Sequence, residues 1–212
     1  MSAIGVLGGT FDPVHCGHIR LAIETRDHLA LDVVRLMPAP NPRLRDAPRA
    51  DGAVRLALIE QAIADEPGLE ADGRELARTG PTYTVETIET LRSELGDASI
   101  TLILGMDAFV KLPDWHRWDE LLGLCHLAVA RRPDASTPAG GEVAALLAER
   151  ATDDARALRA RPAGFIHLCP VPMLDISATR IRALLAAGRS VRCLVPDSIN
   201  QSLIEENPYA DA

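Results

Sequence analysis

The eleven-residue segment at positions 8–18, Gly-Gly-Thr-Phe-Asp-Pro-Val-His-Cys-Gly-His, constrains the fold of this chain more than any other. The apolar run at 3–7 before it is typical of a fully buried parallel strand. After the segment, apolar residues recur at helical spacing up to about Leu31. We therefore expect a strand, a tight turn and a helix, with His18 in the first turn of that helix.

The start of a helix is a favourable place for an anion, because unpaired backbone N–H groups and the helix dipole both attract negative charge. Gly8 and Gly9 let a ligand approach the backbone closely, and Thr10 adds a hydroxyl donor. His15 and His18 can face one developing negative charge from the same turn. This combination predicts a phosphate-binding site.

Three other interpretations of the turn are weaker. The two histidines could form a buried pair with structural hydrogen bonds alone. A zinc site is disfavoured because His15, Cys16 and His18 crowd four positions and the sequence shows no second ligand cluster, so no protein-held metal is predicted. The glycines match neither the G-x-G-x-x-G pattern of dinucleotide-binding proteins nor the Walker pattern.

The composition limits the class of protein. With 212 residues, the chain is long enough for one domain and short for two, so we expect a single domain over 1–212. A net charge of −8 argues against a nucleic-acid partner. Lys111 is the only lysine, so phosphate-binding side-chain cations are expected to be arginines. The absence of a long apolar run and of C-x-x-C spacing predicts a cytoplasmic enzyme with free thiols and no membrane partner.

Strand-like and helix-like segments alternate along the chain. We expect strands at 3–7, 32–37, 69–71, 99–104, 127–130 and 165–169. This alternation predicts an α/β fold with a single doubly wound, mostly parallel sheet and helices on both faces. In such sheets ligands bind beyond the carboxyl ends of the strands, which would bring together the segments 8–18, 105–107 and 177–182.

Three local expectations concern the rest of the chain. Thr82 or Thr84 is expected to cap the helix that follows the Gly80-Pro81 turn signal. The charged, alanine-rich segment 142–160 is expected to form one peripheral helix. The arginine-bearing loop at 38–50 is either a solvated connection or a flap near the phosphates, and the sequence favours neither.

The eleven-residue segment resembles the signature of the nucleotidylyltransferase superfamily, in which an H-x-G-H pair lies beside the α-phosphate of a nucleoside triphosphate. Residues 176–182, Ile-Ser-Ala-Thr-Arg-Ile-Arg, resemble its second motif, I-S-x-T-x-x-R. The resemblance implies a Rossmann-like fold and catalytic roles for His15, His18 and Arg182. The ATP-binding residues that it implies are Gly8, Gly9, Thr10, Phe11, Gly17, His18, Gly105, Asp107, Ile176, Ser177, Thr179 and Arg182.

Within this superfamily, the chain resembles the bacterial nicotinate-nucleotide adenylyltransferases essentially from end to end. The specific pieces are residues 74–84, 104–107, 115, 131–133 and 194–196. The resemblance implies adenylyl transfer from ATP, carried with Mg²⁺, to nicotinate mononucleotide, with pyrophosphate as the second product. The acceptor-binding residues that it implies are Thr10, Arg45, Tyr83, Thr84, Trp115, His116 and Arg132, with Trp115 stacked on the nicotinate ring.

One segment departs from that family. Its members often carry an asparagine pair or a Pro-Pro-His-Lys/Arg run where this chain reads Pro-Ala-Pro-Asn-Pro-Arg-Leu-Arg at 38–45, and Arg45 aligns with the basic position. Two alternatives therefore stay open: a sister adenylyltransferase acting on nicotinamide mononucleotide or phosphopantetheine, and a non-catalytic nucleotide sensor. The oligomeric state is also open, with a homo-oligomer as one outcome.

Overall fold

The computed structural model describes residues 1–40, 47–131, 137–172 and 174–210. Within these ranges, six strands form one sheet in the order β3-β2-β1-β4-β5-β6, and every neighbouring pair is parallel. The strands are β1 (Ala3–Gly9), β2 (Val33–Pro38), β3 (Leu69–Ala71), β4 (Ser99–Gly105), β5 (His126–Arg131) and β6 (Ile166–Pro170). The prediction of a doubly wound parallel sheet is confirmed, and the strand order reverses between β1 and β4.

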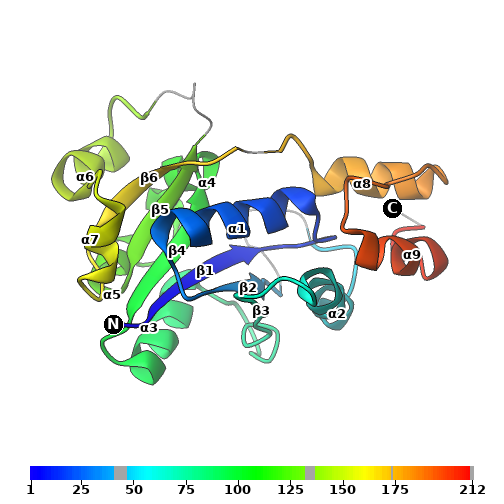
Figure 1. The fold of residues 1–212 in the computed structure, drawn as a ribbon, viewed down its shortest axis with the longest axis horizontal. Helices are drawn as coiled ribbons and strands as arrows, with labels where there is room; N and C mark the ends of the chain where they lie inside the picture. Colours follow the sequence, from blue (N-terminus) through cyan, green and yellow to red (C-terminus); the bar gives the residue numbers. More distant parts are fainter. Residues whose placement is uncertain (41–46, 132–136, 173, 211–212) are drawn as a thin grey trace.

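Helices cover both faces of this sheet (Figure 1). In β4, Ile103 packs in one buried cluster, and Leu102 and Leu104 pack in the other, on the opposite face of the sheet. Because both faces are buried, the strand is a continuous apolar run in the sequence. The α1 helix packs on the first face and α3 on the second. The helices are α1 (Cys16–Leu29), α2 (Gly52–Ile63), α3 (Thr84–Leu95), α4 (Met106–Val110), α5 (Leu121–Leu124), α6 (Glu142–Arg150), α7 (Ala155–Arg159), α8 (Ala178–Ala186) and α9 (Asp197–Glu205).

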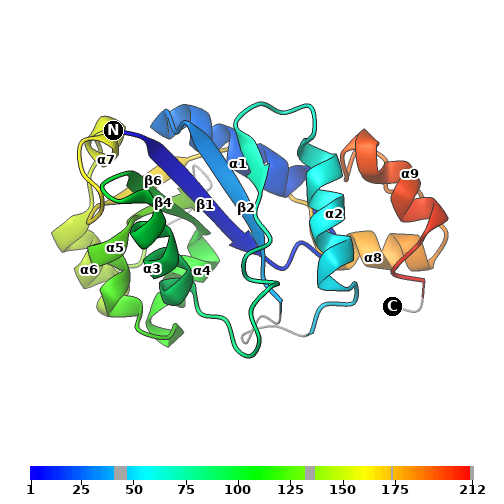
Figure 2. The same cartoon turned by 90° about the horizontal axis from the view of Figure 1, so that it is seen from below.

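Three helices extend the molecule beyond the carboxyl end of β1. Figures 1 and 2 both show α2, α8 and α9 past the tip of the β1 arrow. The α2 and α9 helices contact each other, with the Ser202 hydroxyl 3.1 Å from Oε1 of Gln61. No helix in the described part of the chain is long and apolar enough to cross a membrane.

Two of the local expectations are wrong. The segment 142–160 forms two helices rather than one, because Ala151 leaves the helix, pairs with Ile166 at the edge of the sheet, and Asp154 caps a new helix. The α3 helix begins at Thr84 with Tyr83 as its N-cap residue and no side-chain cap. Thr84 therefore already lies inside the helix, and Thr82 lies before the cap position.

Candidate active site

The turn after β1 places two histidine rings against each other at the start of α1. His15 is the N-cap residue and His18 lies in the first turn, as expected. Their rings stack with centroids 3.6 Å apart, and the Phe11 and His18 rings form a T-shaped pair with centroids 4.8 Å apart. The His15 backbone N–H donates to Nδ1 of His18 at 3.3 Å. An imidazole that accepts at Nδ1 carries its proton at Nε2, so His18 is held as an Nε2–H donor.

His15 is buried and therefore neutral at physiological pH. Its exposed fraction is 6%, and burial lowers its pKa from the ordinary 6.5 to about 4. In the described part of the chain, its Nδ1 is buried without a hydrogen-bond partner. A buried polar atom that lacks a partner costs free energy unless a ligand or water satisfies it. The turn thus holds one imidazole that can gain a hydrogen bond from an incoming group.

The depressed pKa of His15 predicts acid sensitivity of the fold. Because the unfolded chain takes up this proton near pH 6.5 and the folded protein only near pH 4, stability is full above pH 6.5 and is lost as the pH falls through this window. We expect His15 to account for about 3 kcal/mol of the loss in unfolding free energy. Urea unfolding of the wild type and of His15→Gln, each at pH 7 and at pH 4, measures this contribution of His15 to the unfolding free energy. Equal pH dependence of the two proteins would contradict this assignment.

The second predicted motif contacts the first. Nη1 of Arg182 donates to the Asp12 backbone oxygen at 2.7 Å and lies 3.7 Å from the Asp12 carboxylate. Nη2 of the same side chain lies 3.3 Å from the Thr179 hydroxyl. Ser177 caps α8 by accepting from the N–H of Arg180 at 3.3 Å. The expected meeting of the segments 8–18 and 177–182 is therefore confirmed, across 170 positions of sequence.

Two residues that hold the turn were missed from the sequence. The Asp12 carboxylate accepts from the backbone N–H groups of Arg49 and Ala50, at 2.8 and 3.1 Å. Arg55 is only 1% exposed and donates to four backbone carbonyls. They are those of Thr10, Ala39, Ala50 and Pro40, at 2.6, 2.8, 3.1 and 3.4 Å. Both side chains thus fasten the turn to the chain that leads into α2.

The helix start offers fewer free amides than the sequence predicts. The N–H of Cys16 donates to the carbonyl of Leu194 at 2.9 Å, and that of His18 donates to the carbonyl of His15 at 2.9 Å. These two amides are therefore committed to the protein. The expected nest of free backbone donors is therefore smaller than the sequence predicts by these two N–H groups.

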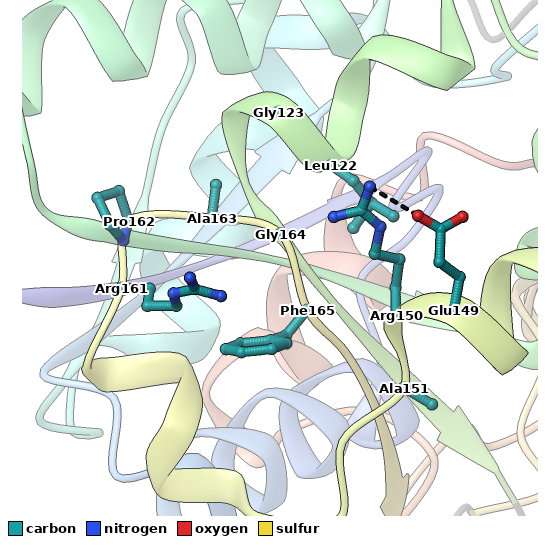
Figure 3. A pocket seen from close by; sticks show the side chains of 10 residues that line it. All are labelled: Leu122, Gly123, Glu149, Arg150, Ala151, Arg161, Pro162, Ala163, Gly164 and Phe165. Carbon is teal, nitrogen blue, oxygen red and sulfur yellow. Dashed lines mark ion pairs between the residues drawn. The ribbon is translucent and has the colours of Figure 1, made fainter.

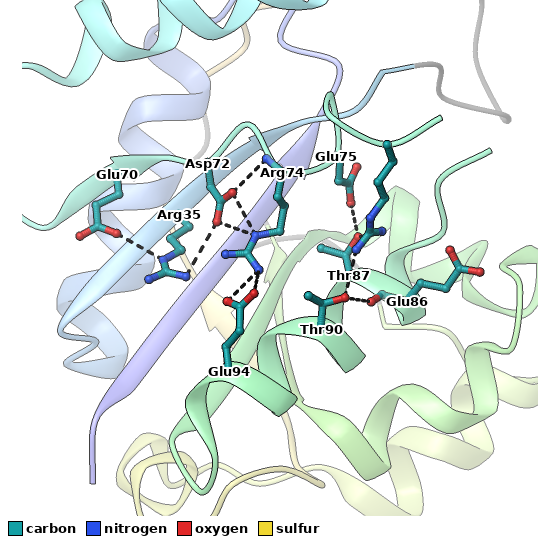
Figure 4. A network of polar contacts seen from close by, with 10 residues as sticks. Arg35, Glu70, Asp72, Arg74, Glu75, Glu86, Thr87, Thr90 and Glu94 are labelled. Carbon is teal, nitrogen blue, oxygen red and sulfur yellow. Dashed lines mark hydrogen bonds and ion pairs between the residues drawn. The ribbon is translucent and has the colours of Figure 1, made fainter. Parts of the chain in front are cut away.

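A polar network holds the loop before α3. The Thr87 hydroxyl donates to Glu75 at 2.7 Å and accepts from Arg78 at 2.9 Å, while Arg74 bridges Asp72 and Glu94 (Figure 4). Burial raises the pKa of Glu75. The loop ends at Tyr83, and the centroid of its ring lies 4.2 Å from the centroid of the His116 ring. The segments around 83 and 116, predicted to share an acceptor site, are brought together.

The other predicted site residues lie as follows. Gly105 ends β4 at the edge where β1 also ends, and the exposed Asp107 lies in the first turn of α4. Trp115 and Trp118 both pack, partly buried, on the same apolar cluster. Ile176 is partly buried just before α8. Arg45 and Arg132 lie outside the described residues.

A surface hollow lies away from this turn. It has a volume of about 560 Å³ and lies between α5, the end of α6 and the segment that leads into β6 (Figure 3). Arg161 covers the Phe165 ring within it at 5.2 Å. Because these residues precede β6, the hollow lies at the amino end of that strand, whereas the histidine turn lies at the carboxyl end of β1. It takes no part in the candidate active site.

The fold and the histidine turn together define a class of nucleotide-handling α/β protein. Comparison with known proteins shows to which family of this class the chain belongs. Residues 6–184 match the family model described as Cytidylyltransferase-like, and the chain belongs to this family. Two of its relatives are named "Probable nicotinate-nucleotide adenylyltransferase", which is a narrower class than the family model describes. The one from Pseudomonas entomophila (strain L48) is 48% identical over 92% of this chain and 90% of its own length, and the one from Pseudomonas paraeruginosa (strain DSM 24068 / PA7) is 49% identical over 92% of each.

This identity and coverage confirm the expected resemblance, and the chain is a member of the nicotinate-nucleotide adenylyltransferase family of nucleotidyltransferases. The fold agrees with a solved structure. Plasmodium falciparum nicotinic acid mononucleotide adenylyltransferase complexed with NaAD superposes with a TM-score of 0.75, covering 99% of this chain and 98% of that one at 13% identity.

Proposed function

We propose that this protein transfers the adenylyl group of ATP to nicotinate mononucleotide, giving nicotinate adenine dinucleotide and pyrophosphate, a step of NAD biosynthesis. One observation carries the proposal. Two stacked histidines, held by a helix start, lie in the turn whose backbone Arg182 contacts. Phosphoryl-group transfer needs this kind of array, in which positioned donors neutralise charge, rather than an enzyme nucleophile.

In this proposal the acceptor phosphate attacks the α-phosphorus of ATP in line. Nε2–H of His18 and the neutral imidazole of His15 bind oxygens on the α-phosphate as negative charge moves toward the leaving pyrophosphate. Arg182 compensates the charge of the β- and γ-phosphates. Further ATP contacts are assigned to the turn, to the end of β4 and to the start of α8, through Gly8, Gly9, Thr10, Phe11, Gly17, Gly105, Asp107, Ile176, Ser177 and Thr179.

The acceptor is proposed to bind on the side of α3. In this proposal main-chain N–H groups near Tyr83, Thr84 and His116 receive the nicotinate carboxylate, and Trp115 supplies the aromatic face for its ring. The contact between the Tyr83 and His116 rings supports this proposal. Thr10 orients the acceptor phosphate. Arg45 and Arg132 complete the proposed acceptor contacts.

The donor set of the turn suits Mg²⁺ that arrives with the nucleotide. Asp12 is the one carboxylate in the segment 8–18, and its oxygens already accept from Arg49 and Ala50. We therefore assign Mg²⁺ to the triphosphate oxygens rather than to a protein cage. When bound, it neutralises charge on the pyrophosphate leaving group.

Gly17 tests the placement of His15. A Cβ added at Gly17 would lie 3.0 Å from Nδ1 and 3.1 Å from Cε1 of the His15 ring, so Gly17→Ala must displace that ring by a few tenths of an ångström. We expect kcat to fall about 10-fold, because small misplacements of positioned groups are costly. Gly123→Ala, whose Cβ would meet nothing within 4 Å, is the matched control and should keep kcat unchanged. A Gly17→Ala variant with wild-type kcat would disprove the role of the His15 position.

Pyrophosphate release from purified protein with Mg²⁺ and ATP tests the proposal, with nicotinate mononucleotide, nicotinamide mononucleotide and phosphopantetheine supplied in parallel. Fast release with the first acceptor alone is expected. Equal rates with the two mononucleotides would refute the proposed recognition of the nicotinate carboxylate and would leave the proposed adenylyl transfer intact. Release with phosphopantetheine alone would assign the protein as a sister adenylyltransferase that acts on phosphopantetheine. ATP binding without pyrophosphate release would assign it as a non-catalytic nucleotide sensor.

We further propose that residues 1–212 act as one domain in the cytoplasm, with ATP and nicotinate mononucleotide as partners and without nucleic-acid or membrane partners. The acidic composition supports the exclusion of nucleic acid. Size-exclusion chromatography with light scattering measures whether the protein is a homo-oligomer.

A further inference from the structure

We propose that His28, His167 and Cys169 form a binding site for a divalent transition-metal ion of the zinc class, at the end of α1 remote from the histidine turn. His28 lies in the last turn of α1, and the other two residues lie on β6. One ligand atom from each lies within 4.8 Å of the others. Two imidazoles and one thiol are the donors that Zn²⁺ prefers in proteins.

The register of β6 places two of the ligands together. Residues two apart in a strand point to the same face, so His167 and Cys169 both face α1. Their partners on β5 are Ala128 and Ala130, which are small residues. The strand pairing therefore leaves space above β6, and the end of α1 brings His28 into it.

The contacts of the two imidazoles prepare them for an ion. Nδ1 of His167 lies 2.8 Å from the carbonyl oxygen of Thr152, so that nitrogen carries the proton and Nε2 presents a lone pair. Nε2 of His28 lies 2.9 Å from this lone pair and must donate to it in the metal-free protein. An imidazole whose second nitrogen donates to a backbone carbonyl is the usual arrangement of a metal-bound histidine.

The geometry needs only small adjustments: the two Nε2 atoms, 2.9 Å apart, must separate slightly, and the sulfur, within 4.8 Å of them, must approach. A tetrahedral Zn²⁺ with ordinary bond lengths holds two nitrogen ligands about 3.3 Å apart and a nitrogen and a sulfur about 3.6 Å apart. His28 is exposed and lies near the helix end, so its side chain can adjust and also gives the ion a path from solvent. The fourth position is left to water.

Cys169 accounts for the expected selectivity. Without metal, its thiol donates its proton to the carbonyl oxygen of His167, at an Sγ–O distance of 4.0 Å. Binding replaces this proton, which leaves to the buffer, and forms a metal–thiolate bond. Hard ions such as Mg²⁺ gain little from a thiolate, so the site is expected to discriminate against the ion that accompanies ATP.

Co²⁺ added to untagged protein tests the site, because a thiolate–Co²⁺ pair gives a near-ultraviolet charge-transfer band. We expect one equivalent to bind with this band, Cys169→Ser to remove it, and His28→Ala to weaken binding at least about 10-fold. Cys125→Ser is the matched control, since Cys125 is also buried but belongs to the cluster on the other face of the sheet. Absence of the band in wild type, or its survival in His28→Ala at equal affinity, would overturn the proposal.

Among the described residues, the histidine turn also offers nitrogen and sulfur to Co²⁺, through Cys16. The Cys16→Ser variant should keep the band, and loss of the band in that variant would assign the metal to the turn. As a second measurement, Zn²⁺ at about 100 times the wild-type dissociation constant should raise the Tm of wild type by about 5 to 10 °C and that of His28→Ala by no more than about half as much. Because His28 is exposed, this variant is expected to fold, and its own Tm and circular dichroism verify it. Neither measurement depends on the proposed adenylyl transfer.

Discussion

Replacement of His18 by alanine is expected to lower kcat for adenylyl transfer about 100-fold or more. The ring of His18 is held by the His15 N–H at its Nδ1 and by its T-shaped contact with Phe11, so its Nε2–H is a donor already oriented before substrate binds. A donor oriented in advance stabilises developing charge without reorganisation during the reaction. Alanine removes that donor, and water in its place is not held in position.

Single-turnover and steady-state kinetics with ATP and nicotinate mononucleotide measure this effect. The expected pattern is a fall in kcat that exceeds any change in KM for ATP, because the interaction strengthens in the transition state. His28→Ala is the matched control, since it removes an exposed histidine from the other end of the same helix and should leave kcat unchanged. Near-normal turnover of a folded His18→Ala protein would refute the catalytic assignment.

Replacement of Arg55 by alanine is expected to lower the free energy of unfolding by about 3 kcal/mol or more. The Arg55 guanidinium is buried and donates to four carbonyls, one in the histidine turn and three in the chain between β2 and α2. Without it, those carbonyls are left short of donors inside the protein, and a large cavity is added. Because one of them is the carbonyl of Thr10, the histidine turn should lose its support, and kcat should fall as well.

Urea unfolding, followed by circular dichroism, measures the loss of stability. Arg20→Ala is the matched control, because Arg20 lies exposed on α1 in an ion pair with Glu24 and should contribute within about 0.5 kcal/mol. The loss of unfolding free energy in Arg55→Lys should lie between those of Arg55→Ala and Arg20→Ala. The lysine ammonium keeps the charge but cannot reach all the carbonyls that the planar guanidinium serves. An Arg55→Ala protein as stable as Arg20→Ala would show that the turn is held by other contacts.

Arg55 also shows how a missed residue could have been found. It lies four residues before Ile59 and eight before Ile63, on the buried stripe of α2. A charged residue in an apolar stripe is a signal for a buried, hydrogen-bonded role. The sequence could not identify its partners, because carbonyl groups leave no trace in the pattern of side chains.

Local patterns in the sequence predicted most of the fold and the position of the two histidines at the start of a helix. The strand, turn and helix around His15 and His18 are encoded within one short segment, where apolar runs, glycines and helical spacing act over a few residues. The parallel sheet followed from the alternation of strands and helices, since parallel strands need crossover connections. The helix break at Ala151 was missed because pairing with Ile166, far along the chain, outweighs local helix propensity.

By itself, the sequence determined the strand-turn-helix unit, the order of the elements and the chemical identity of the groups in each motif, because these depend on neighbours along the chain. Tertiary structure alone decided which distant groups meet. It placed Arg182 on the Asp12 carbonyl, buried His15 so that it is neutral, and brought His28 to β6 across 139 positions. Hydrogen bonds and desolvation depend on distances in space, and those distances exist only after the sheet has assembled and the helices have packed on it.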